Sequence, residues 1–466
     1  MESMRVGLRL VLGLLGASIF VGATGCGGDE SAQPGGSGQA DGGGGSAGGG
    51  GGGGVASICE DATGTPVVHS GGMTASETWG PDAVHVVEGS FKISGPSTLT
   101  LKPCVQVRMR GGAGFDVRAD GSSIVSAGEA NGRVTITADD PSVGWANIRV
   151  LPPSTLNLAY TTIEHGGRAP NDPMFAVLDV YGEQTAPVQP ALHVEHVDIV
   201  DAGAIGVALT ENAGFSAEST ALGITGSGAY PVRVWPSALT NIPEGVYAGN
   251  TRDEIVITGR PLELDATMRN RGVRYLVGDE LSGSKIAVGA GDTGLATLTI
   301  EAGVELAFKA GGMLELEHFT GDFPASGALV AVGTADAPVR FTSSDSAAPG
   351  AWVGLFFGGV PDASNRIENA VIEYAGGETG AQGFNCSDIQ NGRDQGAVLI
   401  LGVPAGAFVK ATHIAHSAGF GVDRGWDGGE IDFVGPNTFD DVAWCLQSAP
   451  HDPDHSCPAN PPCPTQ

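Results

Sequence analysis

The chain has 466 residues, of which 76 are Gly, 28 are Pro and only 16% are charged. Its formal net charge of −29 argues against nucleic acid or an anionic lipid surface as a partner, because binding to either calls for a basic patch. Hydrophobic residues make up 41% of the chain, enough for a substantial core, and the prolines follow no Gly-X-Y period, which excludes collagen.

The N-terminal residues have the layout of a secretory signal. Arg5 and Arg9 precede an apolar run over residues 10–23, which is shorter than a membrane-spanning helix requires. The run ends in "ATGC", which resembles the lipobox of bacterial lipoproteins, although Ala replaces the larger hydrophobic residue usual three places before the Cys. The resemblance implies cleavage before Cys26 and acylation of that residue. It also implies an outer-membrane lipoprotein, because Gly rather than Asp follows Cys26.

A long Gly-rich stretch follows the signal. Residues 27–54 contain almost nothing to bury and have maximal backbone entropy to lose, so we interpret them as a flexible tether. The predicted organisation is a series of five segments: signal peptide 1–25, tether 26–57, first half of a folded body 58–240, second half 241–448, and a Cys- and Pro-rich tail 449–466.

Six cysteines remain if Cys26 carries lipid, an even number that predicts disulfides in an exported protein. Proximity favours a bridge between Cys59 and Cys104. The other four allow three pairings, of which we favour the following two bridges: Cys386–Cys445 and Cys457–Cys463. A zinc site that includes His451 and His455 is the alternative, but the ligand spacing matches no standard pattern.

The chain repeats one line of sequence. "WANIRVLPPSTLNLAYTTIEHGG" at 145–167 resembles "WVGLFFGGVPDASNRIENAVIEYAGG" at 352–377. Further matches on both sides, such as "TLTLKPCVQV" with "TLTIEAGVEL", keep the same order along the chain. Chance matches would not stay collinear, so we interpret the folded body as two copies of one unit.

Short runs of alternating apolar and polar residues, rich in β-branched side chains, dominate both halves. In chain order, clear examples are residues 97–109, 133–138, 191–200, 298–308 and 339–344. Hairpin turns such as Asn-Gly are sparse, which favours a solenoid of parallel strands over a sandwich. We expect Leu158, Ile163, Ile367 and Ile372 to face inward, and Glu164 and Glu373 to face outward.

The phrases "LTIEAGVEL", "GTADAPVRFTS" and "WVGL" in residues 298–355 resemble those of the right-handed parallel β-helix proteins of the pectin-lyase-like superfamily. The likeness is to bacterial surface lipoproteins and adhesin-like proteins. It covers about residues 76–446 and is strong in the second half and weaker in the first. It implies an all-β fold: a right-handed parallel β-helix. It says little about activity, because a fold does not fix function.

Few residues suggest chemistry. Asp139, Asp140 and Asp345 are weak candidates for calcium binding, the only cofactor considered, and ordinary acidic turns are the alternative. We single out no catalytic residue, since the pair Glu164 and His165 is matched in the second half by Glu and Tyr.

Two other kinds of residue have simpler interpretations. His413 and His416 would lie on opposite faces of a strand, which disfavours a shared metal ion. Trp145 and Trp352 belong to the repeated framework, so packing is favoured over sugar stacking.

Three functions fit this sequence. The leading hypothesis is a non-enzymatic, lipid-anchored envelope protein that presents a rigid surface for adhesion or for binding a glycan or matrix, facing either the periplasm or the outside. The first alternative is a polysaccharide lyase or glycoside hydrolase that uses acidic residues on one face. The second is a structural component of the envelope.

Overall fold

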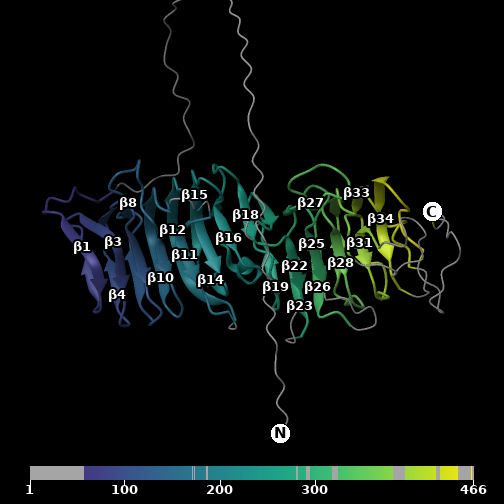
Figure 1. Ribbon diagram of the computed structural model, residues 1–466, viewed down its shortest axis with the longest axis horizontal. Helices are drawn as coiled ribbons and strands as arrows, with labels where there is room; N and C mark the ends of the chain where they lie inside the picture. Colours follow the sequence, from purple (N-terminus) through teal and green to yellow (C-terminus); the bar gives the residue numbers. More distant parts are fainter. Residues whose placement is uncertain are drawn as a thin grey trace, which may run out of the picture. The chain divides into compact units, whose positions relative to one another are not determined.

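The protein is described by a computed structural model. It describes residues 57–169, 172, 174–184, 187–279, 282–289, 294–316, 324–380, 394–426, 431–449 and 463. These residues all belong to one compact unit, Val55–Gln466. Within them, regular structure is β-strand apart from one 3-10 helix, and the strands of successive coils lie over one another in parallel (Figure 1). This arrangement is all-β and compatible with a β-helix.

Three columns of hydrogen-bonded strands make up the first half. Column 1 contains β1 (Val67–Met73), β3 (His85–Ile93), β5 (Gln106–Met109), β8 (Val134–Ala138), β10 (Thr155–Glu164), β12 (Gln189–Val200), β15 (Thr220–Thr225) and β17 (Gly245–Val246). Column 3 contains β2 (Glu77–Trp79), β4 (Thr98–Leu101), β7 (Ser123–Ala127) and β14 (Ala213–Phe215), with the first residues of β10 and β12.

Column 2 runs through both halves. It begins on the last residues of β1, which pair with the last residues of β3. It then contains β6 (Gly114–Val117), β9 (Ile148–Val150), β11 (Ala176–Tyr181), β13 (Ile205–Thr210), β16 (Val232–Val234), β18 (Glu254–Ile257), β21 (Arg274–Val277), β24 (Glu305–Phe308), β27 (Val339–Ser343), β30 (Ala370–Glu373), β33 (His413–Ser417) and β35 (Thr438–Val442).

Two separate sheets complete the second half. Column 4 contains β19 (Pro261–Leu262), β22 (Lys285–Val288), β25 (Met313–Leu316), β28 (Gly354–Phe357), β31 (Gly396–Ile400) and β34 (Phe420–Arg424). Column 5 contains β20 (Ala266–Met268), β23 (Ala296–Ile300), β26 (Gly327–Val332), β29 (Arg366–Glu368) and β32 (Val409–Lys410).

Single residues turn the chain sharply from one column to the next. Tyr160 within β10 has a φ of 42°, and His196 within β12 has a φ of 53°. This left-handed conformation bends each strand, so that its first residues pair in column 3 and its last residues pair in column 1. The two bends lie one coil apart, and the two rings stack with their centroids 4.7 Å apart.

A single hydrophobic cluster fills the inside of the coils from Met73 to Phe433. It includes the four residues that we expected to face inward, each with 0% of its surface exposed: Leu158, Ile163, Ile367 and Ile372. In strands such as β4, β5 and β8 the alternating pattern places every second residue in this cluster and the others outside. The prediction of inward and outward faces is therefore confirmed at these positions.

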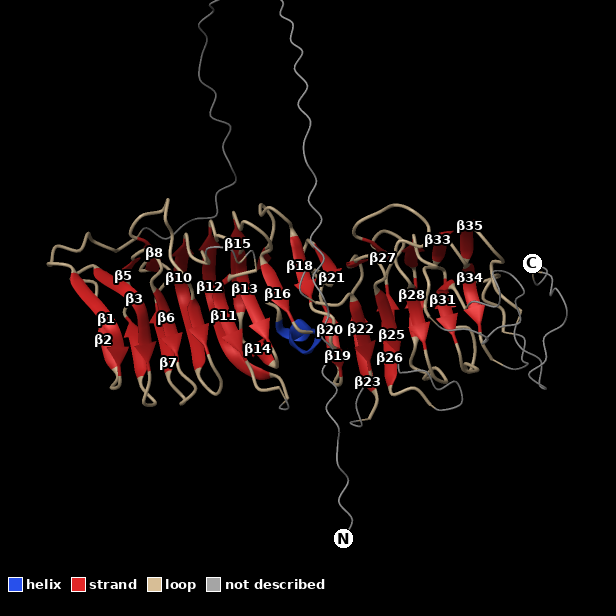
Figure 2. Cartoon of the chain, in the orientation of Figure 1, coloured by secondary structure: helices blue, strands red, loops and turns tan. Residues whose placement is uncertain are grey.

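The columns change at the middle of the unit. Column 1 ends at β17 and column 3 at β14, whereas columns 4 and 5 begin at β19 and β20. The 3-10 helix η1 (Pro236–Asn241) contacts both β14 and β20, and Figure 2 shows it as the only helix drawn. Pro236 lacks the N–H that a strand ladder needs, so the chain at this level forms a helical turn instead. Among the strands that the structure describes, only column 2 connects the two halves by strand pairing.

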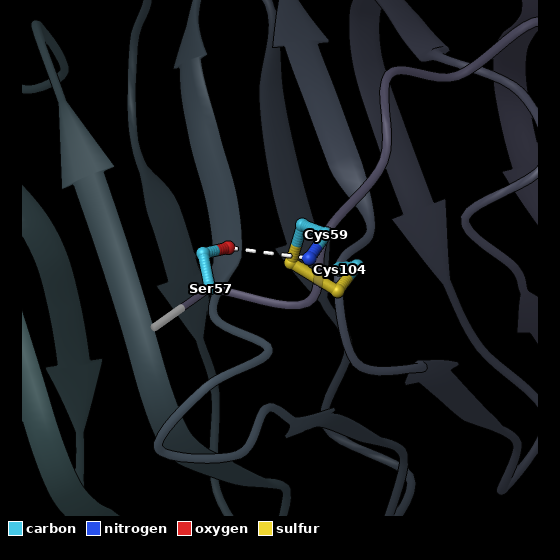
Figure 3. Close-up of a disulfide and its surroundings, with 3 residues drawn as sticks. All are labelled: Ser57, Cys59 and Cys104. Carbon is cyan, nitrogen blue, oxygen red and sulfur yellow. Dashed lines mark hydrogen bonds between the residues drawn. A yellow bond between two sulfur atoms is a disulfide. The ribbon is translucent and has the colours of Figure 1, made fainter. Parts of the chain in front are cut away.

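Two disulfides close the described ends of the unit. Cys59 bonds to Cys104, with Cα atoms 5.2 Å apart, which confirms the first predicted bridge (Figure 3). Cys445 bonds to Cys463, with Cα atoms 5.3 Å apart. The predicted pairs Cys386–Cys445 and Cys457–Cys463 are therefore wrong, because Cys445 and Cys463 are bonded to each other. Cys386, Cys457 and the lipid-attachment candidate Cys26 lie outside the described residues.

Candidate functional site

The two framework tryptophans are packing residues. Trp145 and Trp352 each have 0% of their surface exposed. The indole N–H of Trp145 donates to the carbonyl of Glu164 at 2.8 Å, and that of Trp352 donates to the carbonyl of Glu373 at 2.8 Å. Neither ring is accessible to a sugar, which agrees with the packing role expected from the sequence.

The three calcium candidates do not lie together. Asp139 and Asp140 follow β8 of column 1, whereas Asp345 follows β27 of column 2. Asp140 accepts hydrogen bonds from the hydroxyl of Ser142 at 2.7 Å and from its N–H at 2.9 Å, and these bonds lower the pKa of the carboxyl. Asp345 accepts a bond from Ser344 at 2.9 Å. In the described part of the chain, no three His, Cys, Asp or Glu residues gather as a metal site would require.

The remaining sequence candidates make separate contacts. Glu373 accepts hydrogen bonds from Arg340 at 2.9 Å and from Thr342 at 3.0 Å, so it belongs to an ion pair on the strand surface. His413 bonds to Thr438, while His416 bonds to Asp441 at 2.9 Å. Each histidine thus bonds to its own partner on β35 (Thr438–Val442).

The corners that follow the column 1 strands form a groove, which we call the corner groove. After β10, β12 and β15 the chain turns through left-handed residues, with φ angles of 57° at His165, 54° at Asp201 and 71° at Gly226. The N–H of His165 donates to the carbonyl of Val200 at 3.1 Å, and that of Asp201 donates to the carbonyl of Thr225 at 3.0 Å. These bonds hold the corners in register from coil to coil.

Glycine forms the floor of the corner groove. The hollow has a volume of ≈ 1070 Å³, at the upper end of the range of known ligand sites. It crosses the corners that contain Gly112, Gly144, Gly167, Gly203 and Gly228. A Cβ atom on Gly228 would lie 2.3 Å from the carbonyl oxygen of Gly203, so a larger residue would not fit there. The close approach of these turns leaves a trough along the stack of coils.

Polar side chains line the corner groove. The stem of Arg168 lies so close to Gly144 and Gly203 that a Cβ atom on either would contact it within 2.4 Å. Its guanidinium reaches the carbonyl of Ser142 at 3.5 Å and is exposed. The Nδ1 atom of His165 lies 3.9 Å from a carboxylate oxygen of Asp201. The groove therefore offers hydrogen-bond donors and acceptors beside an open floor.

A second polar group lies on the outer face of column 2, and we call it the charged row. The strand register places Asp116, Arg149 and Asp179 on successive coils. The Arg149 guanidinium lies 5.1 Å from the centre of the Tyr181 ring. Burial raises the pKa of the Asp179 carboxyl, although the nearby Arg149 opposes that rise. Further along the same face, Arg233 forms an ion pair with a buried Asp279.

Sequence patterns did not reveal either group. Arg168 and Asp179 have no matching charged residue in the second copy of the sequence line, so a search for shared residues passes over them. A search for charged residues at outward positions of neighbouring strands would have found the charged row, but it requires the strand register. Comparison of the chain with protein-family models, curated proteins and solved structures gives no match. No helix in the described ranges is long and apolar enough to cross a membrane.

Proposed function

We propose that this chain is an outer-membrane lipoprotein, non-enzymatic, that binds an extended glycan or matrix chain along the corner groove. The groove is the observation that carries the proposal. It crosses the corners of five coils, and coil spacing of about 4.8 Å gives it a length of roughly 19 Å. An extended polymer lying along this trough would meet a similar corner at each step. The lipid anchor rests on the sequence around Cys26.

The proposed fold is a right-handed parallel β-helix of the pectin-lyase-like type, built from two copies of one unit. Matching positions with left-handed backbone support the two copies, since few non-Gly residues adopt this conformation. Tyr160 and Asn369 have φ angles of 42° and 49°, and His165 and Tyr374 have φ angles of 57° and 63°. The indole bonds of Trp145 and Trp352 to matching carbonyls point the same way.

The chemistry of the corner groove favours a polyhydroxylated chain. Arg168 supplies donors only, Asp201 supplies acceptors, and His165 can do either according to its protonation. Hydroxyl groups both donate and accept, so a sugar chain can satisfy all three side chains. The net charge of −29 disfavours a polyanion, whose approach the rest of the surface would oppose.

A glycan array probed with the purified full chain tests this function. We expect at least one extended glycan to bind, and Arg168→Gln and Asp201→Asn each to weaken its binding. Arg366→Gln is the matched control, because Arg366 is exposed and pairs with Glu368 away from the groove. Absence of any glycan ligand, or equal binding by all four proteins, would reject the proposal. Retention of the Cys26→Ser chain in the membrane fraction would reject the lipid anchor.

The charged row supports a second candidate, a glycoside hydrolase. Asp116 and Asp179 are two strand spacings apart, or about 9–10 Å, close to the separation of the carboxyl pair in inverting enzymes. A raised pKa suits Asp179 to act as the general acid. Release of reducing sugar by the purified chain, abolished in Asp179→Asn, would establish this activity over simple binding.

A further inference from the structure

A second hollow lies at the place where columns 1 and 3 end and columns 4 and 5 begin, and we call it the junction pocket. Its volume is ≈ 450 Å³, within the range of sites for small ligands. Residues before β14, along η1 and around β19 contribute to its walls. It shares no residue with the corner groove or the charged row.

Trp235 and Arg260 form one part of the wall. The guanidinium of Arg260 lies 4.9 Å from the centre of the Trp235 ring, within the range of a cation–π interaction. Within the described residues, Arg260 makes no hydrogen bond and no ion pair. Its N–H groups are therefore positioned by stacking and remain available to a ligand.

A buried hydroxyl adds an independent sign of a ligand. Ser237 lines the junction pocket, and its Oγ atom is buried and has no hydrogen-bond partner among the residues that the structure describes. An unsatisfied buried hydroxyl is destabilising unless something in the pocket bonds to it. Asn212 and Asn241 direct their amide N–H groups to backbone carbonyls, which leaves their side-chain oxygens as acceptors.

The pocket combines acceptors, donors and an apolar surface. Asp265 and Glu263 line it and can only accept hydrogen bonds, whereas Arg260 can only donate them. Leu264, with 49% of its surface exposed, and the buried Phe215 supply apolar area. The two carboxylates would repel an anion and Arg260 would repel a cation, so a neutral ligand with both donors and acceptors fits the lining best.

We propose that the junction pocket binds one neutral pyranose unit. The ring hydroxyls accept from Arg260 and donate to Asp265, the Ser237 hydroxyl completes the set, and the C–H face of the ring covers Leu264. This site is independent of glycan binding in the corner groove, and it goes beyond that function because it recognises a single sugar unit rather than a chain.

Titration of the full chain with the methyl glycosides of glucose, galactose, mannose and N-acetylglucosamine tests the assignment, with glucuronate and glucosamine as charged comparators. Saturation-transfer NMR and tryptophan fluorescence report binding. We expect at least one neutral glycoside to bind at millimolar concentration. Ser237→Ala should weaken its binding about 3- to 10-fold and Arg260→Gln about 10-fold or more.

Ser237→Ala removes an unsatisfied buried group, so this variant is expected to fold normally and keeps the test decisive if Arg260→Gln unfolds. Arg366→Gln is the control that should bind as the wild type does. Three results would overturn the proposal: no neutral glycoside binds, only a charged comparator binds, or both pocket variants bind unchanged. Polymer binding is followed separately with Arg168→Gln, so that the pocket and the corner groove can fail independently.

Discussion

His165 in the first half and Tyr374 in the second occupy matching corners, with φ angles of 57° and 63°. Each follows a strand that ends in Ile-Glu, next to a buried tryptophan. The surroundings differ, because the first corner is flanked by Arg168, and the position that matches Arg168 is Gly377. Strand stacking thus fixes the backbone of both halves, whereas the corner side chains are free to carry different chemistry.

The two halves also differ in how their strands stack. By sequence, β24 of the second half matches β5 of the first, which lies in column 1. In space β24 continues column 2. If the halves are the two copies that we propose, the second is rotated by one face relative to the first. The junction pocket lies where columns 1 and 3 end and columns 4 and 5 begin.

The largest effect should come from the matched tryptophans. We expect Trp145→Ala and Trp352→Ala each to lower the free energy of unfolding by about 3–5 kcal/mol, because each leaves a cavity and an unpaired carbonyl. Urea unfolding followed by circular dichroism measures both. A difference of more than about 2 kcal/mol between the two variants would contradict the equivalence of the halves.

The two disulfides provide a comparison of the ends. Cys59→Ser opens a bridge with a sequence separation of 45 residues, and Cys445→Ser opens one of 18. Loop entropy predicts losses of about 4 and about 3 kcal/mol in unfolding free energy. Thermal unfolding of the two variants checks this order, and a larger loss at the C-terminal bridge would show that loop length does not control the difference.

The sequence predicted the coil framework because that framework is local. Alternation places Leu158 and Ile367 inside, and the Trp of each repeated line of sequence, Trp145 and Trp352, is buried. The sequence did not predict the change of columns at the middle of the unit. The partner of β21 depends on which column continues beyond η1, and the sequence pattern does not reveal this. Nor did it predict Cys445–Cys463, because pairing depends on where the end of the chain folds back.

The candidate sites were less predictable than the fold. Arg168 lines the corner groove because glycines of neighbouring coils leave room for its side chain, and sequence distance hides that contact. Trp235 and Arg260 lie on the two sides of the predicted boundary at residue 240, and the repeated line of sequence includes neither of them. These sites arise from the stacking of coils, so their residues carry no motif of their own.

Substitution of the matched glutamates, Glu164 and Glu373, should change the free energy of unfolding by different amounts. Glu373 bonds to Arg340 and Thr342, with 18% of its side chain exposed, whereas Glu164 makes no side-chain bond to any described residue. We expect Glu373→Gln to lower the unfolding free energy by about 1–2 kcal/mol. Glu164→Gln should change it by less than about 0.5 kcal/mol, and equal effects in urea unfolding would refute the distinction.

Acid should weaken the first coil, because it contains a hydrogen-bonded pair of histidines, His69 and His85. The strands described in the second half contain no such pair. A nitrogen of His69 lies 2.9 Å from Nδ1 of His85, and Nε2 of His85 lies 3.0 Å from the carbonyl of Gly80. A carbonyl can only accept, so His85 carries its proton on Nε2 and accepts from His69 through Nδ1. Protonation of Nδ1 would break the bond between the rings.

Burial lowers the pKa of both His69 and His85 below 6.5. The neighbouring His85 lowers the pKa of His69 further, whereas the charge of Glu77 raises it. The unfolded chain therefore takes up protons first as the pH falls. The stability contributed by the neutral pair is complete above pH 6.5 and is lost as the pH falls from there through the folded pKa values. Hydrogen exchange of β1 amides at pH about 7.5 and about 5.5 measures this loss. His85→Gln should reduce the pH dependence and the exposed His413→Gln should retain it, whereas equal slopes in all three proteins would exclude the pair as its source.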